Sequence, residues 1–357
     1  MQWKLWLRVL LAILSICGVL CVAVVVMPPN PAGPAAEPAP PVEIRPDAGP
    51  DQNLGLPDDF AEVDAATNDA LFPMPFAAEG DENLERHQSA NARLYRAAVK
   101  VSTPSKPVGQ QFPAMFQETG DCVSQGFCNA YKLRLSVQVA SGRPQRVIDP
   151  FPPYTYGATR VLVDGPKLPC RRAGAYPSSA IKAFREFGVV TAEEAGVPYS
   201  GRLADDWGCN GPPARLIALG KQRTGDAYPI RSAAEAAAAL DNGYPLTLST
   251  TWRPDAGREI DGRIVCRRGG NWAHQMAVIG FDGAVSDKLE RKYFLIWNSH
   301  GAQAHKKPLG DEPQGSFWVT WPEFDRICQS STLYAINDAT GFPADDLDWS
   351  LFDRLKE

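Results

Sequence analysis

Three residues of this sequence, Cys122, His274 and Asn298, carry the groups that a thiol nucleophile requires. A cysteine thiol has a pKa of about 8.5, so it needs a helix N-terminus or an imidazole partner to react as a thiolate near neutral pH. A histidine can take the thiol proton, and a third side chain that accepts the imidazole N–H holds the reactive tautomer. The expected chemistry is attack on an acyl carbon through a thioester.

The local sequence around each of these residues fits its role. Gly120-Asp-Cys122 stands where a long helix is expected to begin, and the unpaired N–H groups of a helix N-terminus favour an anion. His274 follows the glycine-rich turn at Gly269-Gly270 and stands at the start of a buried strand. Asn298 follows the apolar run 293–297, so a strand end would deliver its amide. Taken singly, a half-cystine or buried thiol, a core histidine and a strand-terminating asparagine are the alternatives.

The sequence holds only four histidines, and the other three are less suited to be the base. His87 lies upstream, in a region with a weak structural pattern, and His305 lies in a polar loop beside two lysines. His300 comes two residues after Asn298. His274 is therefore the expected base.

Helical patterns come first in the body of the chain, and strand patterns come later. Apolar periodicity predicts helices at 123–139, 178–187 and 232–240. Short runs rich in apolar, β-branched and aromatic residues predict the strands 246–251, 275–281, 292–297 and 316–321. This order predicts an α+β fold with a helical half and a sheet half.

The N-terminal residues predict a membrane anchor. Lys4 and Arg8 precede the uncharged run Val9–Met27, which is about long enough to cross a bilayer core of roughly 30 Å. The positive-inside tendency places residues 1–8 in the cytoplasm and the rest outside, in the periplasm or the extracellular space. A cleaved secretory signal is the alternative, but no small-x-small site follows the run. Lipoprotein attachment at Cys17 or Cys21 is disfavoured by bulky preceding residues.

Composition changes along the chain predict its further organisation. Residues 28–57 are rich in Pro and Ala and form an expected extended linker. Residues 58–110 are interpreted as a stalk or a short pro-segment, with one possible helix between 81 and 100. An ordered domain is expected over 111–340, followed by a tail at 341–357.

Charge and cysteine spacing exclude two classes of function. The net charge is -5, and no basic stripe marks a nucleic-acid interface. No cysteine pair has C-x-x-C spacing, so we expect no structural zinc, and we expect no cofactor. The sequence carries no signal for oligomeric state. Export favours disulfides among the cysteines beyond the apolar run.

Four blocks in the order of the family resemble the papain-like cysteine peptidases over residues 112–336. They are Gln117-Glu-Thr-Gly-Asp-Cys122, the stretch from Gly174-Ala-Tyr-Pro to Val-Pro-Tyr199, Trp272-Ala-His274-Gln-Met-Ala-Val-Ile-Gly-Phe-Asp, and Leu295-Ile-Trp-Asn298-Ser-His-Gly with Gly315-Ser-Phe-Trp-Val. The resemblance implies a long central helix packed against an antiparallel sheet or barrel, with the site in the cleft between the two halves. It also implies a divergent member, because Val123 and His300 stand where the family usually has tryptophan.

The resemblance implies a role for each matched residue. Cys122 would attack a peptide carbonyl, and His274, oriented by Asn298, would accept the thiol proton and protonate the leaving amine. The Gln117 side chain and the Cys122 N–H would stabilise the oxyanion, at about 3–4 kcal/mol per donor. His300 departs from the family, and we hypothesise that its titratable ring couples to His274 as a secondary site residue. The implied cross-links are Cys170–Cys209 and Cys266–Cys328, which leaves Cys128 as a buried core thiol.

The implied substrate is a peptide or protein outside the cytoplasm. Two alternatives stay open. One is a catalytically silent papain-like module that binds or scaffolds at the membrane. The other is amidase or transglutaminase-like acyl transfer on the same triad, because a thioester does not dictate its acceptor.

Overall fold

The computed structural model describes residues 55–71, 84–143, 146–170, 172–338 and 347–349 of the chain. The chain divides into the units Met1–Asp47 and Ala48–Glu357, and all described residues belong to the second. The predicted anchor at 9–27, most of the linker and most of the C-terminal tail lie outside the described residues. None of the helices within the described ranges is long and apolar enough to cross a membrane.

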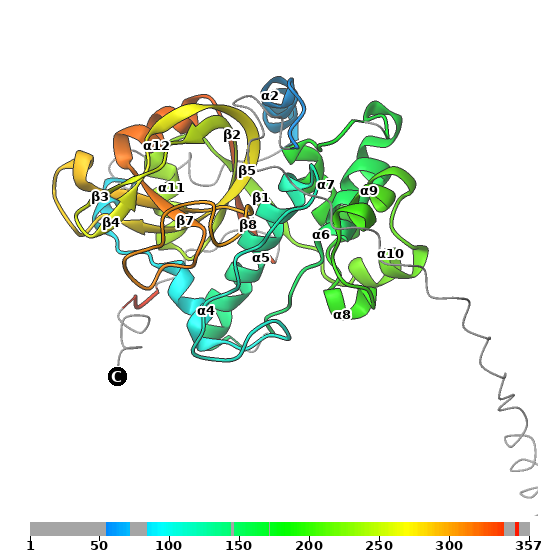
Figure 1. The fold of residues 1–357 in the computed structure, drawn as a ribbon, viewed down its shortest axis with the longest axis horizontal. Helices are drawn as coiled ribbons and strands as arrows, with labels where there is room; N and C mark the ends of the chain where they lie inside the picture. Colours follow the sequence, from blue (N-terminus) through cyan, green and yellow to red (C-terminus); the bar gives the residue numbers. More distant parts are fainter. Residues whose placement is uncertain (1–54, 72–83, 144–145, 171, 339–346, 350–357) are drawn as a thin grey trace, which may run out of the picture. The chain divides into compact units, whose positions relative to one another are not determined.

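The long helix α5, Cys122–Ala140, lies between a helical half and a sheet half (Figure 1). It is buried from Cys122 to Gln138, so its polar side chains need partners inside the protein. The Arg134 guanidinium donates to the Asn337 side chain and to the Gly243 carbonyl, both at 3.0 Å. The helix predicted at 123–139 is confirmed.

Short helices form the half on one side of α5 (Figure 1). Its aromatic core includes Phe151 and Trp207, whose rings meet edge to face at 5.7 Å between centroids. The predicted helix at 178–187 is confirmed as α7, with Pro at its start and Gly188 after its end. The helical segments are α6 Pro152–Gly157, η3 Ala158–Asp164, η4 Gly165–Lys167, α7 Pro177–Phe187, α8 Ala192–Ala195, α9 Gly201–Asn210 and α10 Ala214–Gly220.

Within the described residues, the other half is one eight-stranded sheet in the order β1-β8-β2-β5-β6-β7-β4-β3. Its strands are β1 Asp226–Ile230, β2 Leu246–Pro254, β3 Arg258–Ile260, β4 Arg263–Val265, β5 Arg268–Asp282, β6 Tyr293–Trp297, β7 Ser316–Thr320 and β8 Thr332–Asn337. All pairs are antiparallel except β4 with β7. The four predicted strands correspond to β2, β5, β6 and β7, and the α+β fold is confirmed.

Two helices pack against the sheet half (Figure 1). The helix α11, Ala233–Asp241, matches the prediction at 232–240, and its start is capped by the Ser232 hydroxyl, which accepts from the Glu235 N–H. The helix α12, Trp321–Gln329, was not predicted. Its first turn contains a proline. The missing N–H costs no hydrogen bond there, because the first N–H groups of a helix have no acceptor within the helix.

Residues upstream of position 111 also belong to the main core. Short helical segments, η1 Arg86–Ser89, η2 Leu94–Arg96 and α4 Ala97–Lys100, replace the single helix expected between 81 and 100. Backbone bonds tie this segment to the end of β5, from Phe281 N–H to the Ala92 carbonyl at 2.8 Å and from Gly283 N–H to Ala90 at 2.7 Å. Packing therefore continues across the expected boundary at 111.

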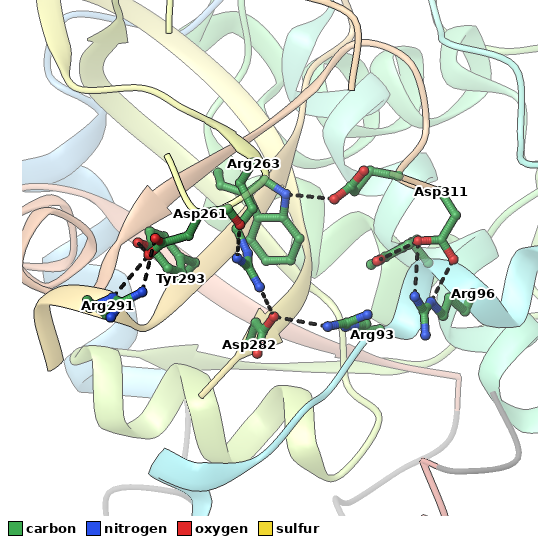
Figure 2. Close-up of polar contacts among 11 residues, drawn as sticks. Arg93, Arg96, Asp261, Arg263, Asp282, Arg291, Tyr293 and Asp311 are labelled. Carbon is green, nitrogen blue, oxygen red and sulfur yellow. Dashed lines mark hydrogen bonds and ion pairs between the residues drawn. The ribbon is translucent and has the colours of Figure 1, made fainter. Parts of the chain in front are cut away.

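A network of ion pairs holds the same segment on the sheet (Figure 2). Arg93 lies 3.0 Å from the Asp282 carboxylate, which Arg263 also contacts. Arg96 lies 2.7 Å from Asp311. The Asp282 side chain is almost completely buried, so its two arginine partners offset the desolvation of the charge.

The cysteines follow the predictions in part. Cys170 and Cys209 form a disulfide, as predicted. The predicted Cys266–Cys328 bridge is wrong, because both thiols are free. The Cys266 thiol is directed at the Asp255 carbonyl at 3.5 Å, whereas Cys328 lies on α12 near Asp325 and Glu235. Cys128 is a buried free thiol beside Thr155, as expected.

Candidate active site

Cys122 is the first residue of α5 and is completely buried. Ser124 and Gln125 donate their N–H groups to the Asp121 carbonyl and so begin the helix. The backbone of Gln275, the residue that follows His274, lies near the thiol and acts to lower the pKa of Cys122, although burial outweighs this effect. The helix tip therefore brings the sulfur to the backbone of β5 beside the histidine.

The approach of α5 to β5 depends on a small residue and a bridging amide. The Gln275 side chain donates to the Val123 carbonyl at 2.7 Å and accepts from the Ser249 hydroxyl at 2.6 Å. A Cβ atom on Gly126 would lie 3.0 Å from both the Gln275 side chain and the Met276 carbonyl. Glycine at this position therefore permits the contact that joins the two halves of the site.

His274 and Asn298 meet through adjacent strands. His274 lies on β5 opposite Thr250 of β2, and Asn298 follows the last residue of β6. The imidazole Nε2 atom is 2.8 Å from the Asn298 Oδ1 atom, and both residues are completely buried. The pairing predicted from the sequence is present.

The hydrogen bonds of Asn298 define the histidine tautomer. The backbone N–H of Ser299 donates to the Asn298 Oδ1 atom at 2.8 Å, which identifies that atom as the oxygen. An oxygen can only accept, so the His274 Nε2 atom must carry the hydrogen. The Nδ1 atom of a neutral His274 then holds a free lone pair. It is buried and has no hydrogen-bond partner within the described residues.

Burial favours the neutral forms of both reactive groups. Burial raises the pKa of the Cys122 thiol well above its usual range, and the nearby Asp121 carboxylate acts in the same direction. Burial also lowers the pKa of His274 well below its usual value, and neighbouring His300 lowers it further. The form described here therefore holds a neutral thiol and a neutral imidazole.

Two aromatic rings pack against the His274 ring. The His300 ring stacks on it with centroids 4.4 Å apart, and Trp272 meets it edge to face at 4.7 Å. Burial lowers the pKa of His300 to about 4. His300 thus supplies a neutral stacking ring at the position where tryptophan was implied, in contact with His274 as expected.

Gln117, the implied oxyanion donor, is anchored next to the triad. Its side-chain amide donates to the Thr119 carbonyl at 3.1 Å, and its Oε1 atom accepts from the Ser299 hydroxyl at 2.7 Å. Its backbone N–H donates to the Ser299 carbonyl at 2.8 Å. These bonds place Gln117 beside the Asn298 segment, and its role as an oxyanion donor stays a prediction.

Residues 55–64 cover the nucleophile. Leu56 and Phe60, the first residue of α2 (Phe60–Leu71), are buried in the same apolar cluster as Cys122. The Gly55 carbonyl accepts from the Ala175 N–H at 3.0 Å. A Cβ atom on Gly55 would lie 2.4 Å from the Gly120 carbonyl oxygen and 3.0 Å from the Cys122 sulfur. The segment therefore fills the space in front of the thiol.

Side-chain bonds hold α2 in this position. The Ser178 N–H donates to the Asp64 carboxylate at 2.9 Å, and the Tyr176 hydroxyl donates to Asp59 at 3.1 Å. Asp64 is completely buried, and burial raises its pKa to about 6. The cover is thus attached to α7 as well as to the site.

Sequence reasoning missed two residues that contact the triad or its flank. His305 accepts from the Asn298 amide, with 2.9 Å between Nδ2 and Nε2. Asp121 is completely buried beside the nucleophile, and burial raises its pKa to about 7. Its carboxyl accepts from Gln125 at 2.9 Å and from the Tyr199 hydroxyl at 3.4 Å. Asp121 lies in the Gln117–Cys122 block that resembles the papain-like peptidases, whereas no local sequence pattern marked His305.

No metal-binding arrangement accompanies the site. Among the side chains that the structure describes, no group of three or more His, Cys, Asp or Glu residues is placed to hold a metal ion.

Comparison with known proteins gives structural matches only. No family model matches the chain, and no curated protein does. The fold is similar to xylellain, a cysteine protease from Xylella fastidiosa, with a TM-score of 0.44 and 16% identity over 64% of this chain and 83% of that one. The proform of the Amb a 11 cysteine protease of ragweed matches with a TM-score of 0.43 and 11% identity over 64% of this chain and 63% of that one. Digestive procathepsin L 3 of Tenebrio molitor matches with a TM-score of 0.43 and 15% identity over 78% of this chain and 87% of that one.

Proposed function

We propose that this chain is a divergent papain-like cysteine peptidase that hydrolyses peptide bonds outside the cytoplasm. The observation that carries the proposal is the bond between the His274 Nε2 atom and the Asn298 Oδ1 atom. It leaves the buried Nδ1 lone pair free, and Cys122 begins the helix whose first turn is bonded to Gln275, the residue that follows His274. A general base needs such a free lone pair within reach of the proton that it takes.

The reaction begins with transfer of the Cys122 proton to the His274 Nδ1 atom. The sulfur attacks the scissile carbonyl carbon, a C–S bond forms and the carbonyl oxygen becomes an oxyanion. The oxyanion collapses, the C–N bond breaks, and the His274 imidazolium protonates the leaving amine. Water then attacks the thioester with His274 again as base, which releases the acid product and restores the thiol. The Cys122 backbone N–H and the Gln117 amide are the proposed oxyanion donors.

This cycle requires movement of residues 55–64. They exclude water and substrate from Cys122, which has no exposed surface in this form. Displacement would remove part of the burial that raises the pKa of the Cys122 thiol, so that pKa would fall toward its usual range. The covered form is therefore latent, and the uncovered form is the active one.

The location of the protein outside the cytoplasm has one structural support. The disulfide between Cys170 and Cys209 is of a kind that persists in oxidising compartments. In this proposal the run Val9–Met27 holds the chain in the membrane with its N-terminus in the cytoplasm.

The test is labelling of Cys122 by iodoacetamide in the full chain, with the modified peptide identified by mass spectrometry. The variant Leu56→Asp places a charge in the apolar cluster over the thiol and should raise the labelling rate at least tenfold. Val197→Asp is the matched control, because Val197 is already 41% exposed. Cys128→Ala should leave the labelling unchanged, and His274→Ala should slow it.

Substrates then distinguish peptidase from other acyl transfer. Hydrolysis of peptide mixtures by the Leu56→Asp chain, lost in Leu56→Asp/Cys122→Ala, supports the proposal. Turnover of glutamine side chains without peptide cleavage would indicate the amidase or transglutaminase-like alternative. A folded Leu56→Asp chain whose Cys122 still fails to react would indicate the silent module.

A further inference from the structure

His305 contacts the nitrogen atom of the Asn298 side-chain amide. Its ring is partly buried and packs on Phe317 of β7, with centroids 4.4 Å apart. Its Nε2 atom is 2.9 Å from the Asn298 Nδ2 atom. The loop after β6 thus folds back and brings the His305 ring to the amide that also accepts from His274.

The direction of this bond follows from the other contacts of the amide. The Asn298 oxygen is identified by the Ser299 N–H and accepts from His274, so the nitrogen faces His305. An amide nitrogen only donates, so the His305 Nε2 atom must be the acceptor and must carry no hydrogen. Neutral His305 therefore has its proton on Nδ1.

Rotation of the amide by half a turn would place donors against donors. The NH₂ group would face the Ser299 N–H and the His274 Nε2–H, and the oxygen would face the lone pair of His305. Each such mismatch in a buried site costs about 1–3 kcal/mol. The contacts with Ser299 and His274 oppose this rotation, and the contact with His305 adds a third. The rotation would remove the oxygen that accepts from His274.

We propose that His305 is a positioning residue, which fixes the Asn298 amide and through it the tautomer of His274. The inference rests on the proposed function for its kinetic consequence, although the tautomer itself does not depend on activity. Removal of the acceptor should lower turnover and leave substrate binding unchanged, because Asn298 and His305 act on the base and not on the substrate.

The charge state of His305 at neutral pH agrees with this role. Burial lowers its pKa to about 4, and the neighbouring His300 acts in the same direction. The other titratable ring nearby is His274, while the Lys306 ammonium group donates to the Gly257 carbonyl at 2.9 Å. Below about pH 4 a protonated His305 would present an N–H to the Asn298 NH₂ group, and the bond would be lost.

The first test reads the tautomer directly. With only four histidines, ¹⁵N-labelled imidazoles of the full chain can be assigned one by one with single His→Gln variants. We expect His274 to be the Nε2–H tautomer in the natural sequence. His305→Phe retains a ring against Phe317 but removes the acceptor, and it should give a mixture of tautomers. His305→Gln supplies an amide oxygen and should restore the single form.

The second test uses steady-state kinetics in the Leu56→Asp background. His305→Phe should lower kcat about 2- to 13-fold, the range that the loss of one hydrogen bond worth roughly 0.5–1.5 kcal/mol gives, with KM changed less than about twofold. His305→Gln should recover most of kcat. His87→Gln is the matched control, because His87 is buried and bonded to Asp241 in a different part of the fold.

The outcomes separate the two proposals. An unchanged His274 tautomer and unchanged kcat in a folded His305→Phe chain would overturn the positioning role and leave the peptidase intact. If Cys122 is unreactive but His305→Phe still shifts the tautomer, the peptidase proposal fails and the positioning of Asn298 stands. Equal losses in His305→Phe and His305→Gln would also contradict the role, because the glutamine retains the acceptor.

Discussion

The Nε2 atom of His274 lies 2.8 Å from the Oδ1 atom of Asn298, and neither residue is exposed to solvent. Because Ser299 donates to the same oxygen, the imidazole must donate through Nε2 and keep the Nδ1 lone pair free. The pair thus selects one tautomer before any substrate arrives. In the proposed reaction, His274 needs that tautomer to accept the Cys122 proton.

Asn298→Ala should lower kcat more than it raises KM. The substitution removes the acceptor for His274 and the donor for His305, so the imidazole loses its fixed tautomer. We expect a fall in kcat of about 10- to 100-fold, equivalent to roughly 1.4–2.7 kcal/mol, in the Leu56→Asp background. Steady-state kinetics on a peptide substrate measure both constants. An equal change in kcat for Asn210→Ala, on the surface helix α9 (Gly201–Asn210), would point to a general loss of structure instead.

Gly55→Ala should uncover the thiol. Gly55 has a positive φ of 124°, and an added Cβ atom would lie 2.4 Å from the Gly120 carbonyl oxygen. The segment must therefore move away from Cys122, and iodoacetamide labelling should accelerate several-fold. Gly109→Ala is the control, since Gly109 also has a positive φ, 88°, but nothing lies within 4 Å of the added atom. Equal rates in the two variants would mean that the Gly55 contact does not protect the thiol.

The buried Asp121 carboxyl should make stability depend on pH. Burial raises its pKa from 3.8 to about 7, so between these values the folded chain binds a proton that the unfolded chain does not. The stability that the protonated Asp121 carboxyl contributes to the fold is therefore fully present below about pH 4. This contribution falls as the pH rises toward 7. Asp121→Asn should flatten that fall, measured by urea unfolding at pH 4.5 and pH 8.

The same substitution should affect the nucleophile. The Asp121 carboxylate raises the pKa of the Cys122 thiol, so its neutral replacement should speed thiol labelling at pH 8. Asp58→Asn, at an exposed aspartate, is the control for both measurements. A pH dependence of unfolding identical in Asp121→Asn and the natural sequence would contradict this assignment.

Loss of the Cys170–Cys209 disulfide should destabilise the helical half. The bridge closes a loop with a sequence separation of 39, for which chain entropy predicts a stabilisation of about 4 kcal/mol. The double variant Cys170→Ser/Cys209→Ser should therefore lower the unfolding free energy by roughly 2–4 kcal/mol in denaturant titrations.

Alkylation of the unreduced, denatured chain tests the thiol assignment. Cys122, Cys128, Cys266 and Cys328 should all be labelled, and Cys170 and Cys209 should not. Protection of both Cys266 and Cys328 would show a second bridge and contradict the structure.

Local sequence patterns were sufficient for the central helix and four strands of the sheet. The apolar and glycine signals that predict 123–139 and 275–281 depend on neighbours along the chain, so they are readable without the fold. The edge strand β1, Asp226–Ile230, was missed because proline interrupts its pattern, and β8, Thr332–Asn337, was also missed.

The sequence by itself determined which groups can react: a thiol at a helix start, a histidine at a strand and an asparagine after the next strand. Tertiary structure alone decided what surrounds them. Gly55 reaches Cys122, and Cys266 and Cys328 remain apart, because packing between distant segments sets those distances and no local preference encodes them. His305 became a partner of Asn298 for the same reason, since the return of a loop onto β7 is a property of the folded chain.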